Sequence, residues 1–161
     1  MLGHLGCQQW NLRSNMWREC IIRVAESFIG TPFHLNSERL GVGIDCGRFP
    51  HAVYSQVGIV VPDLPSHWPR DFMCNAMADS EPYLAIIRQA FNEVVSAQPG
   101  DLAVFKPLRS RCFSHAAIVV EWPIVIHARG VGSAPKVERG YANQWPLAGS
   151  PVLFFSPKVA R

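Results

Sequence analysis

The chain has 161 residues, enough for one compact domain with a single hydrophobic core. Its balance of 48% hydrophobic and 17% charged residues argues against wholesale disorder. The net charge is only +3 and no basic run occurs, so a nucleic-acid-binding protein is not indicated, although an anionic polymer such as a cell wall remains a compatible partner.

The amino terminus lacks the pattern of a secretory signal, because residues 1–8 contain no basic start followed by an apolar block. The longest apolar stretches, such as residues 116–120, are too short to span a bilayer. We therefore expect no signal peptide and no transmembrane segment. We expect synthesis in the cytoplasm, so that any action outside the cell needs another delivery route.

The cysteine pattern argues against a disulfide framework and against structural zinc. The number is odd and no two cysteines form a CxxC pair. Cys112 and His115 have ligand-like spacing, but no second pair matches them. We expect no metal and no cofactor. The five positions are Cys7, Cys20, Cys46, Cys74 and Cys112.

The first half of the chain predicts helices. Residues 1–14 form a polar lead-in, and residues 15–161 are expected to form one domain. A first helix is predicted over 15–29, capped by Asn15 and stopped by Gly30. A glycine-rich loop over 40–43 then leads into the next helix.

The second helix is predicted from Cys46 to about Val57, with Asp45 as its N-cap and Gly58 at its end. Periodicity places Phe49, Val53 and Tyr54 toward the core. Pro50 conflicts with this start, because it falls just past the positions where a helix tolerates proline.

The second half predicts mainly strands. A proline-containing surface loop over 61–75 and a third helix over 83–95 precede a turn at 98–101. Short β-like runs then follow to the end of the chain. Helices followed by strands indicate an α+β fold with a mostly antiparallel sheet. The predicted strands are 102–105, 115–121, 124–127, 136–139 and 152–155.

Three residues suggest nucleophilic catalysis. Cys46 would lie at the first turn of a helix, where free N–H groups and the helix dipole favour a thiolate. His115 and His127 lie on strand-like segments and could deprotonate the thiol and orient its base. The N–H groups of Cys46 and Gly47 could stabilise an oxyanion. The pattern indicates a cysteine hydrolase.

Five segments carry a resemblance to a known family. They are Gly30-Thr31-Pro32-Phe33, Gly43-Ile44-Asp45-Cys46, Pro99-Gly100-Asp101-Leu102, Ser114-His115-Ala116 and Ile126-His127-Ala128. In this order they resemble the NlpC/P60 family of papain-like cysteine peptidases, from about Ile21 to the carboxyl terminus. Residues 32–46 and the pair Val137-Glu138 are most similar to the subgroup encoded with phage tail genes.

The resemblance implies a papain-like α+β fold and an endopeptidase that cuts peptidoglycan stem peptides. The implied bond joins the γ-carboxyl of D-glutamate to a diamino acid. Cys46 would be the nucleophile, His115 the general base and later acid, and His127 the orienting residue. Phage tail proteins would be partners, and carriage on a virion to the cell wall would explain an enzyme without a signal peptide.

The sequence departs from the family pattern at three places. It has Gly47-Arg48 where Ser-Gly is common, Phe33 where tyrosine is common, and Pro50 in the predicted helix. Arg48 could bind a substrate carboxylate, and His34 could border the cleft. Two alternatives stay open: an amidase or acyltransferase on the same fold, and a catalytically weak structural tail or assembly component.

Overall fold

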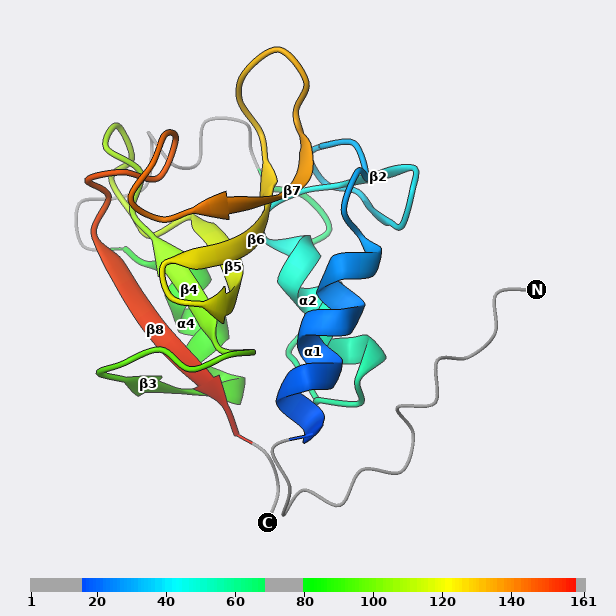
Figure 1. The fold of residues 1–161 in the computed structure, drawn as a ribbon. Coiled ribbons are helices and arrows are strands. Elements are labelled where there is room, and N and C mark those ends of the chain that lie inside the picture. Colours follow the sequence, from blue (N-terminus) through cyan, green and yellow to red (C-terminus); the bar gives the residue numbers. More distant parts are fainter. Residues whose placement is uncertain (1–15, 69–79, 159–161) are drawn as a thin grey trace.

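A computed structural model describes residues 16–68 and 80–158 (Figure 1). In these residues three helices accompany a six-stranded sheet and a separate two-stranded sheet. The helices are α1 (Met16–Ser27), α2 (Arg48–Gln56) and α4 (Pro82–Ala90). The strands are β1 (Glu38–Arg39), β2 (Gly43–Ile44), β3 (Phe91–Val94), β4 (Leu102–Phe105), β5 (His115–Glu121), β6 (Ile124–Arg129), β7 (Lys136–Tyr141) and β8 (Val152–Pro157).

The large sheet has the strand order β3-β8-β4-β5-β6-β7, and every neighbouring pair is antiparallel. Strands β4 to β7 follow one another across the sheet, and β8 returns to pair between β4 and β3. Strands β1 and β2 form the small sheet beside the start of α2. This arrangement confirms the predicted α+β fold.

The helices cover one face of the large sheet, and Figure 1 shows α1 and α2 side by side against it. Alternate strand residues such as Ile118 and Ile126 meet the helices, while Ala117 and Val125 point to the opposite face. The hydrophobic cluster on the opposite face is smaller. Ala142 and Leu147, in the segment that follows β7, cover part of it. This core therefore holds α1 and α2 against β5 and β6, the strands that carry the two candidate histidines.

The expected third helix is wrong beyond Ala90. Residues 91–94 form strand β3, which pairs with β8 in the register Phe91 to Pro157. Phe91 is buried and packs edge-on against Tyr54, with ring centroids 4.9 Å apart. Pairing with β8 also satisfies the backbone groups of this segment. Tertiary packing therefore overrides the helical periodicity of residues 83–95.

The other elements agree closely with the expectations. The first helix begins by Met16 and ends before Gly30, whose φ of +92° suits only a glycine stop. Strands β4 and β5 have the predicted bounds, and β6, β7 and β8 each extend two residues further. The Asn15 cap and residues 69–75 of the expected loop lie outside the described residues. Helices long and apolar enough to cross a membrane are not found in the described part.

The cysteine expectation needs one correction. Cys20, on the buried side of α1, is disulfide-bonded, so the odd cysteine count does not exclude an individual bridge. Cys46 is half-buried and Cys112 is buried. Cys7 and Cys74 lie outside the described residues.

A partly buried ion pair ties α1 to the turn before β4. Arg18 Nη1 lies 2.7 Å from Asp101 Oδ1 and also donates to the carbonyl of Pro99 at 2.8 Å. The other carboxylate oxygen accepts from the N–H of Gln98 at 2.8 Å, as expected of a turn residue. Asp101 is almost fully buried, so these partners offset the cost of burying its carboxylate.

Replacement of Arg18 by Met should lower the free energy of unfolding by about 3 kcal/mol, because it leaves the buried Asp101 carboxylate uncompensated. Urea denaturation followed by circular dichroism measures the change. Arg88→Met is the matched control, because the Arg88–Glu93 pair is exposed and should contribute less than about 1 kcal/mol. Equal effects of the two substitutions would contradict this account of the pair.

Candidate active site

The start of α2 is built around the buried carboxylate of Asp45. Oδ1 accepts hydrogen bonds from the N–H groups of Gly47 at 3.0 Å and Arg48 at 2.8 Å. Oδ2 accepts from the N–H of Asn36 at 2.8 Å and from the Arg48 guanidinium at 2.7 Å. The N-cap of α2 is Gly47 and not Asp45 as expected, but the Asp45 carboxylate closes the turn before the helix and fixes the backbone on both sides of Cys46.

Helix α2 itself begins at Arg48, two residues later than expected. Pro50 is therefore its third residue and lies in the first turn, where N–H groups have no partner within the helix. The predicted core residues Phe49, Val53 and Tyr54 are all buried. The conflict between Pro50 and a helix here disappears.

Arg48 serves the scaffold, which corrects the expectation of a substrate contact. Only 5% of its surface is exposed. Its guanidinium bonds Asp45 Oδ2, and it also donates to the carbonyls of Pro65 and Ser66, the latter at 3.1 Å. These contacts hold the segment after α2 against the helix start. The Arg48 side chain is therefore not available to bind a substrate.

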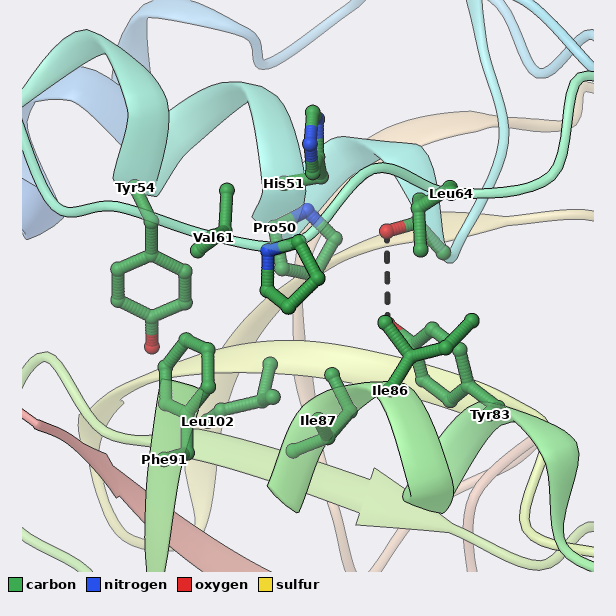
Figure 2. A pocket seen from close by; sticks show the side chains of 12 residues that line it. Pro50, His51, Tyr54, Val61, Leu64, Tyr83, Ile86, Ile87, Phe91 and Leu102 are labelled. Carbon is green, nitrogen blue, oxygen red and sulfur yellow. Dashed lines mark hydrogen bonds between the residues drawn. The ribbon is translucent and has the colours of Figure 1, made fainter. Parts of the chain in front are cut away.

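Tyr83 supports the same turn from α4. Its hydroxyl donates to the carbonyl of Gly47 at 3.4 Å, and Figure 2 shows the ring reaching from α4 toward α2. A small apolar cavity lies between these helices, lined by side chains such as Pro50, Ile87 and Leu102. Its volume of about 20 Å³ holds at most one water, so it is no substrate site.

The Cys46 thiol points toward the first residues of β5. Its Sγ donates to the carbonyl of Ser114 at 3.6 Å, one residue before His115. Burial, and secondly the nearby charge of Asp45, raise the pKa of Cys46 to about 12. A pKa this high favours the protonated thiol at neutral pH, in contrast to the thiolate that the position at the helix start alone predicts.

His115 and His127 are hydrogen-bonded neighbours on adjacent strands. Ala117 pairs with His127 across β5 and β6, so His115 lies diagonally opposite His127 on the same sheet face. His115 Nε2 lies 2.8 Å from His127 Nδ1. The ring of Phe105 flanks His115 on its other side, with centroids 6.2 Å apart. The bond to His127 uses Nε2 and leaves the Nδ1 atom of His115 for another partner.

Burial keeps both imidazoles neutral. It lowers the pKa of His115 to about 3, with a smaller contribution from His127. It lowers the pKa of His127 to about 4, and the opposed charges of Glu138 and Arg129 act in opposite directions on that ring. With both rings neutral, a lone pair on His115 Nδ1 requires that His115 Nε2–H donates to His127 Nδ1.

A cleft of about 720 Å³ opens over the thiol and His115. Four separate segments form its walls: residues 33–35, residues 107–115 around the start of β5, the end of β6 with its following loop, and residues 146–147. The lining residues are Phe33, His34, Leu35, Cys46, Pro107, Ser114, His115, Arg129, Gly130, Val131, Pro146 and Leu147. This volume suits a peptide-sized ligand.

Two of the expected oxyanion and substrate groups, His34 and Gly47, differ in their position relative to the cleft. His34 lines the cleft beside Cys46, and its ring packs closely on the backbone of Gly43. Gly47 does not line the cleft, and its N–H already donates to Asp45. Within the described residues the Cys46 N–H makes no backbone hydrogen bond, so it is the donor left for an oxyanion.

Sequence reasoning missed Arg129 and Glu138. Glu138 pairs with His127 in the register of β6 and β7, and Arg129 lies two residues after His127 on the same face. The two side chains form an ion pair with Nε and Oε1 2.5 Å apart. Strand alternation from His127 could have identified Arg129, whereas the pairing with Glu138 depends on the register. Groups of three metal-ligating side chains do not occur in residues 16–68 and 80–158.

The neutral thiol predicts a characteristic alkylation profile. The rate of Cys46 carbamidomethylation should rise about tenfold per pH unit from pH 7 to 10, because only the thiolate reacts. Mass spectrometry of the labelled peptide measures the rate, and Cys46→Ala supplies the background from Cys112. A plateau below pH 8 would contradict a neutral resting thiol and favour a thiolate–imidazolium pair.

The buried histidines predict acid sensitivity. Because the pKa of His127 is lower in the folded protein than in the unfolded chain, the unfolded chain binds more protons between pH 6.5 and about 4. The free energy of unfolding should fall by up to about 1.4 kcal/mol per pH unit as pH drops through this window. Urea denaturation at pH 7 and 4.5 should show a smaller difference for His127→Gln. The exposed His67→Gln control should match the wild type.

Known structures share this architecture. The NlpC/p60 domain of the peptidoglycan hydrolase SagA is 24% identical, with a TM-score of 0.56 over 84% of this chain and 96% of that chain. RipB of Mycobacterium tuberculosis, a peptidoglycan hydrolase, is 20% identical, with a TM-score of 0.58 over 97% and 72%. RipD of M. tuberculosis, a non-catalytic domain adapted to peptidoglycan binding, is 16% identical, with a TM-score of 0.55 over 87% and 96%.

No curated protein is significantly similar to the chain. The model of the NlpC/P60 family matches residues 30–148, which is most of the chain and includes the helix start, both histidine strands and the cleft. The chain belongs to the NlpC/P60 family.

Proposed function

We propose that the protein is a cysteine endopeptidase that hydrolyses peptidoglycan stem peptides. The proposed bond joins the γ-carboxyl of D-glutamate to the diamino acid. One observation carries the proposal: the Cys46 thiol and His115 line one peptide-sized cleft, and His127 bonds the far side of the His115 ring. This is the nucleophile, base and orienting group of a thiol hydrolase.

Acylation begins with the thiol still protonated. Cys46 Sγ attacks the scissile carbonyl carbon while its proton passes to His115 Nδ1, so that no free thiolate accumulates. The tetrahedral oxyanion accepts a hydrogen bond from the Cys46 N–H. His115 then gives the proton to the diamino-acid nitrogen, the C–N bond breaks, and the acyl group remains as a thioester on Cys46.

Deacylation reverses the roles with water in place of the amine. His115 removes a proton from water as the water oxygen attacks the thioester carbonyl. The S–C bond breaks, His115 returns its proton to the sulfur, and the D-glutamyl carboxylic acid leaves and ionises by giving its proton to water. Throughout, His127 keeps the His115 ring oriented and accepts its Nε2–H, which places the reactive lone pair on Nδ1.

The structural relatives supply support and a rival. SagA and RipB are described as peptidoglycan hydrolases, and they share the fold at 24% and 20% identity. RipD shares it too and is non-catalytic, and the high pKa of the Cys46 thiol suits a similarly weak or inactive protein. A structural tail component is the corresponding rival here. An amidase or acyltransferase would use the same thiol with a different acceptor.

We further propose that the protein reaches the cell wall as part of a phage or prophage tail. The motivation is the similarity of residues 32–46 and of Val137-Glu138 to the tail-encoded subgroup. Copurification of the protein with assembled tail particles would support this setting, and its absence from purified particles would remove the support.

Digestion of purified peptidoglycan tests the activity. Mass spectrometry should detect new free amino groups on the diamino acid with wild type, and the rate should fall by at least about 10³-fold in Cys46→Ala and His115→Ala. His127→Ala should retain more activity than either, because it acts through His115.

Each alternative has its own outcome. Transfer of the acyl group to an added amine or alcohol, with little hydrolysis, would replace the peptidase by an acyltransferase. Binding of folded wild type to peptidoglycan without cleavage would replace it by a wall-binding protein. Cleavage by Cys46→Ala at the wild-type rate would contradict the thiol mechanism itself.

A further inference from the structure

We infer that Arg129 is a positioning residue that fixes one wall of the cleft and thereby sets the affinity for substrate. The inference rests on the proposed hydrolysis, and it concerns how the cleft is shaped rather than how the bond is broken. Arg129 lines the cleft at the end of β6, two residues beyond His127. The family segments described above do not include it.

The guanidinium is first held by Glu138 on the adjacent strand. Arg129 Nε donates to Oε1 at 2.5 Å and Nη2 donates to Oε2 at 3.1 Å, a two-pronged pairing. The Arg129 side chain is 12% exposed and that of Glu138 is 28% exposed, so the pair is partly shielded from water. Such a fork fixes the orientation of the guanidinium as well as its position.

The same guanidinium binds the loop between β6 and β7. Its nitrogen atoms donate to the carbonyls of Val131 and Ala134, the latter at 3.2 Å. Gly132 lies between them at φ +90°, and a Cβ there would come within 2.4 Å of Nη1. The loop therefore passes close to the arginine, at a backbone φ that favours glycine.

A second segment, which follows β7, also meets the arginine. The Arg129 guanidinium lies 5.8 Å from the ring centre of Trp145, which also packs beside Gly132. Pro146 and Leu147, next in the chain, line the cleft, as do Gly130 and Val131. Arg129 thus connects the two segments that supply these four lining residues, and Figure 1 shows the β6–β7 loop rising at that end of the sheet.

The catalytic groups are held by other contacts. Asp45 fixes the backbone around Cys46, and His127 and Phe105 flank His115. Loss of the Arg129 contacts should therefore loosen the cleft wall while leaving the thiol and its base in place. This loosening should mainly raise KM, because it weakens the binding of the substrate and of the transition state alike. Lysine should not replace arginine here, because its ammonium group is a point charge that cannot make the two-pronged pairing with Glu138.

A spin label tests the positioning without substrate. Ser133 is exposed in the loop between the two carbonyls that Arg129 binds, so Ser133→Cys in a Cys46→Ala background provides a labelling site, and the labelled Cys46→Ala protein without Ser133→Cys supplies the background of the other cysteines. Electron paramagnetic resonance should show a restricted label with Arg129 present and several-fold faster motion after Arg129→Gln or Arg129→Lys. Arg139→Gln is the matched control. Arg139 lies on the neighbouring strand β7, pairs with Glu26 of α1 and does not line the cleft.

Kinetics on the proposed substrate complete the test. Arg129→Lys, which keeps the positive charge that acts on His127, should raise KM about tenfold with kcat within about twofold, and Arg139→Gln should change neither. Glu138→Gln, which keeps the arginine, should give a smaller increase in KM. Unchanged label mobility, or a fall in kcat at constant KM, would overturn the inference. If the wild type cleaves no stem peptide, the proposed function fails, and label mobility alone still decides whether Arg129 holds the wall.

Discussion

The position of Cys46 depends on one buried carboxylate. Asp45 accepts bonds from two N–H groups of the following turn, from the loop at Asn36 and from the Arg48 guanidinium, so the backbone before and after the cysteine is fixed together. A buried ion pair gives little net stability, because desolvation offsets the attraction between the charges. The Asp45–Arg48 pair matters here because it fixes the position of the backbone around Cys46. Removal of either partner would leave the other charge buried and uncompensated near the thiol.

This arrangement has an electrostatic consequence for the chemistry. The carboxylate that fixes Cys46 also disfavours a thiolate, and burial adds to the effect. His115 is kept neutral by its own burial between Phe105 and His127. In the proposed mechanism the thiol therefore starts protonated, and its proton leaves as the sulfur reaches the substrate carbonyl.

Much of the fold could be predicted from the sequence, since strand alternation and glycine stops are local signals. The bounds of β4 and β5, and the core face of α2, are of this kind. Strand β3 could not be predicted, because residues 91–94 have helical periodicity and become a strand only by pairing with β8. Arg48 was misassigned for a similar reason: a charged residue beside a nucleophile suggests a ligand contact, and only the structure shows that its donors bind Asp45 and the segment at 65–66.

The central claim is that Cys46 forms a thioester with the γ-glutamyl part of a stem peptide. Rapid acid quenching of the wild-type protein with a stem peptide, followed by peptide mass mapping, tests it most directly. The account predicts a mass increase on the Cys46 peptide equal to the acyl fragment, absent from the Cys112 peptide and lost in His115→Ala. Product formation without any adduct on Cys46, or an adduct on another residue, would contradict it.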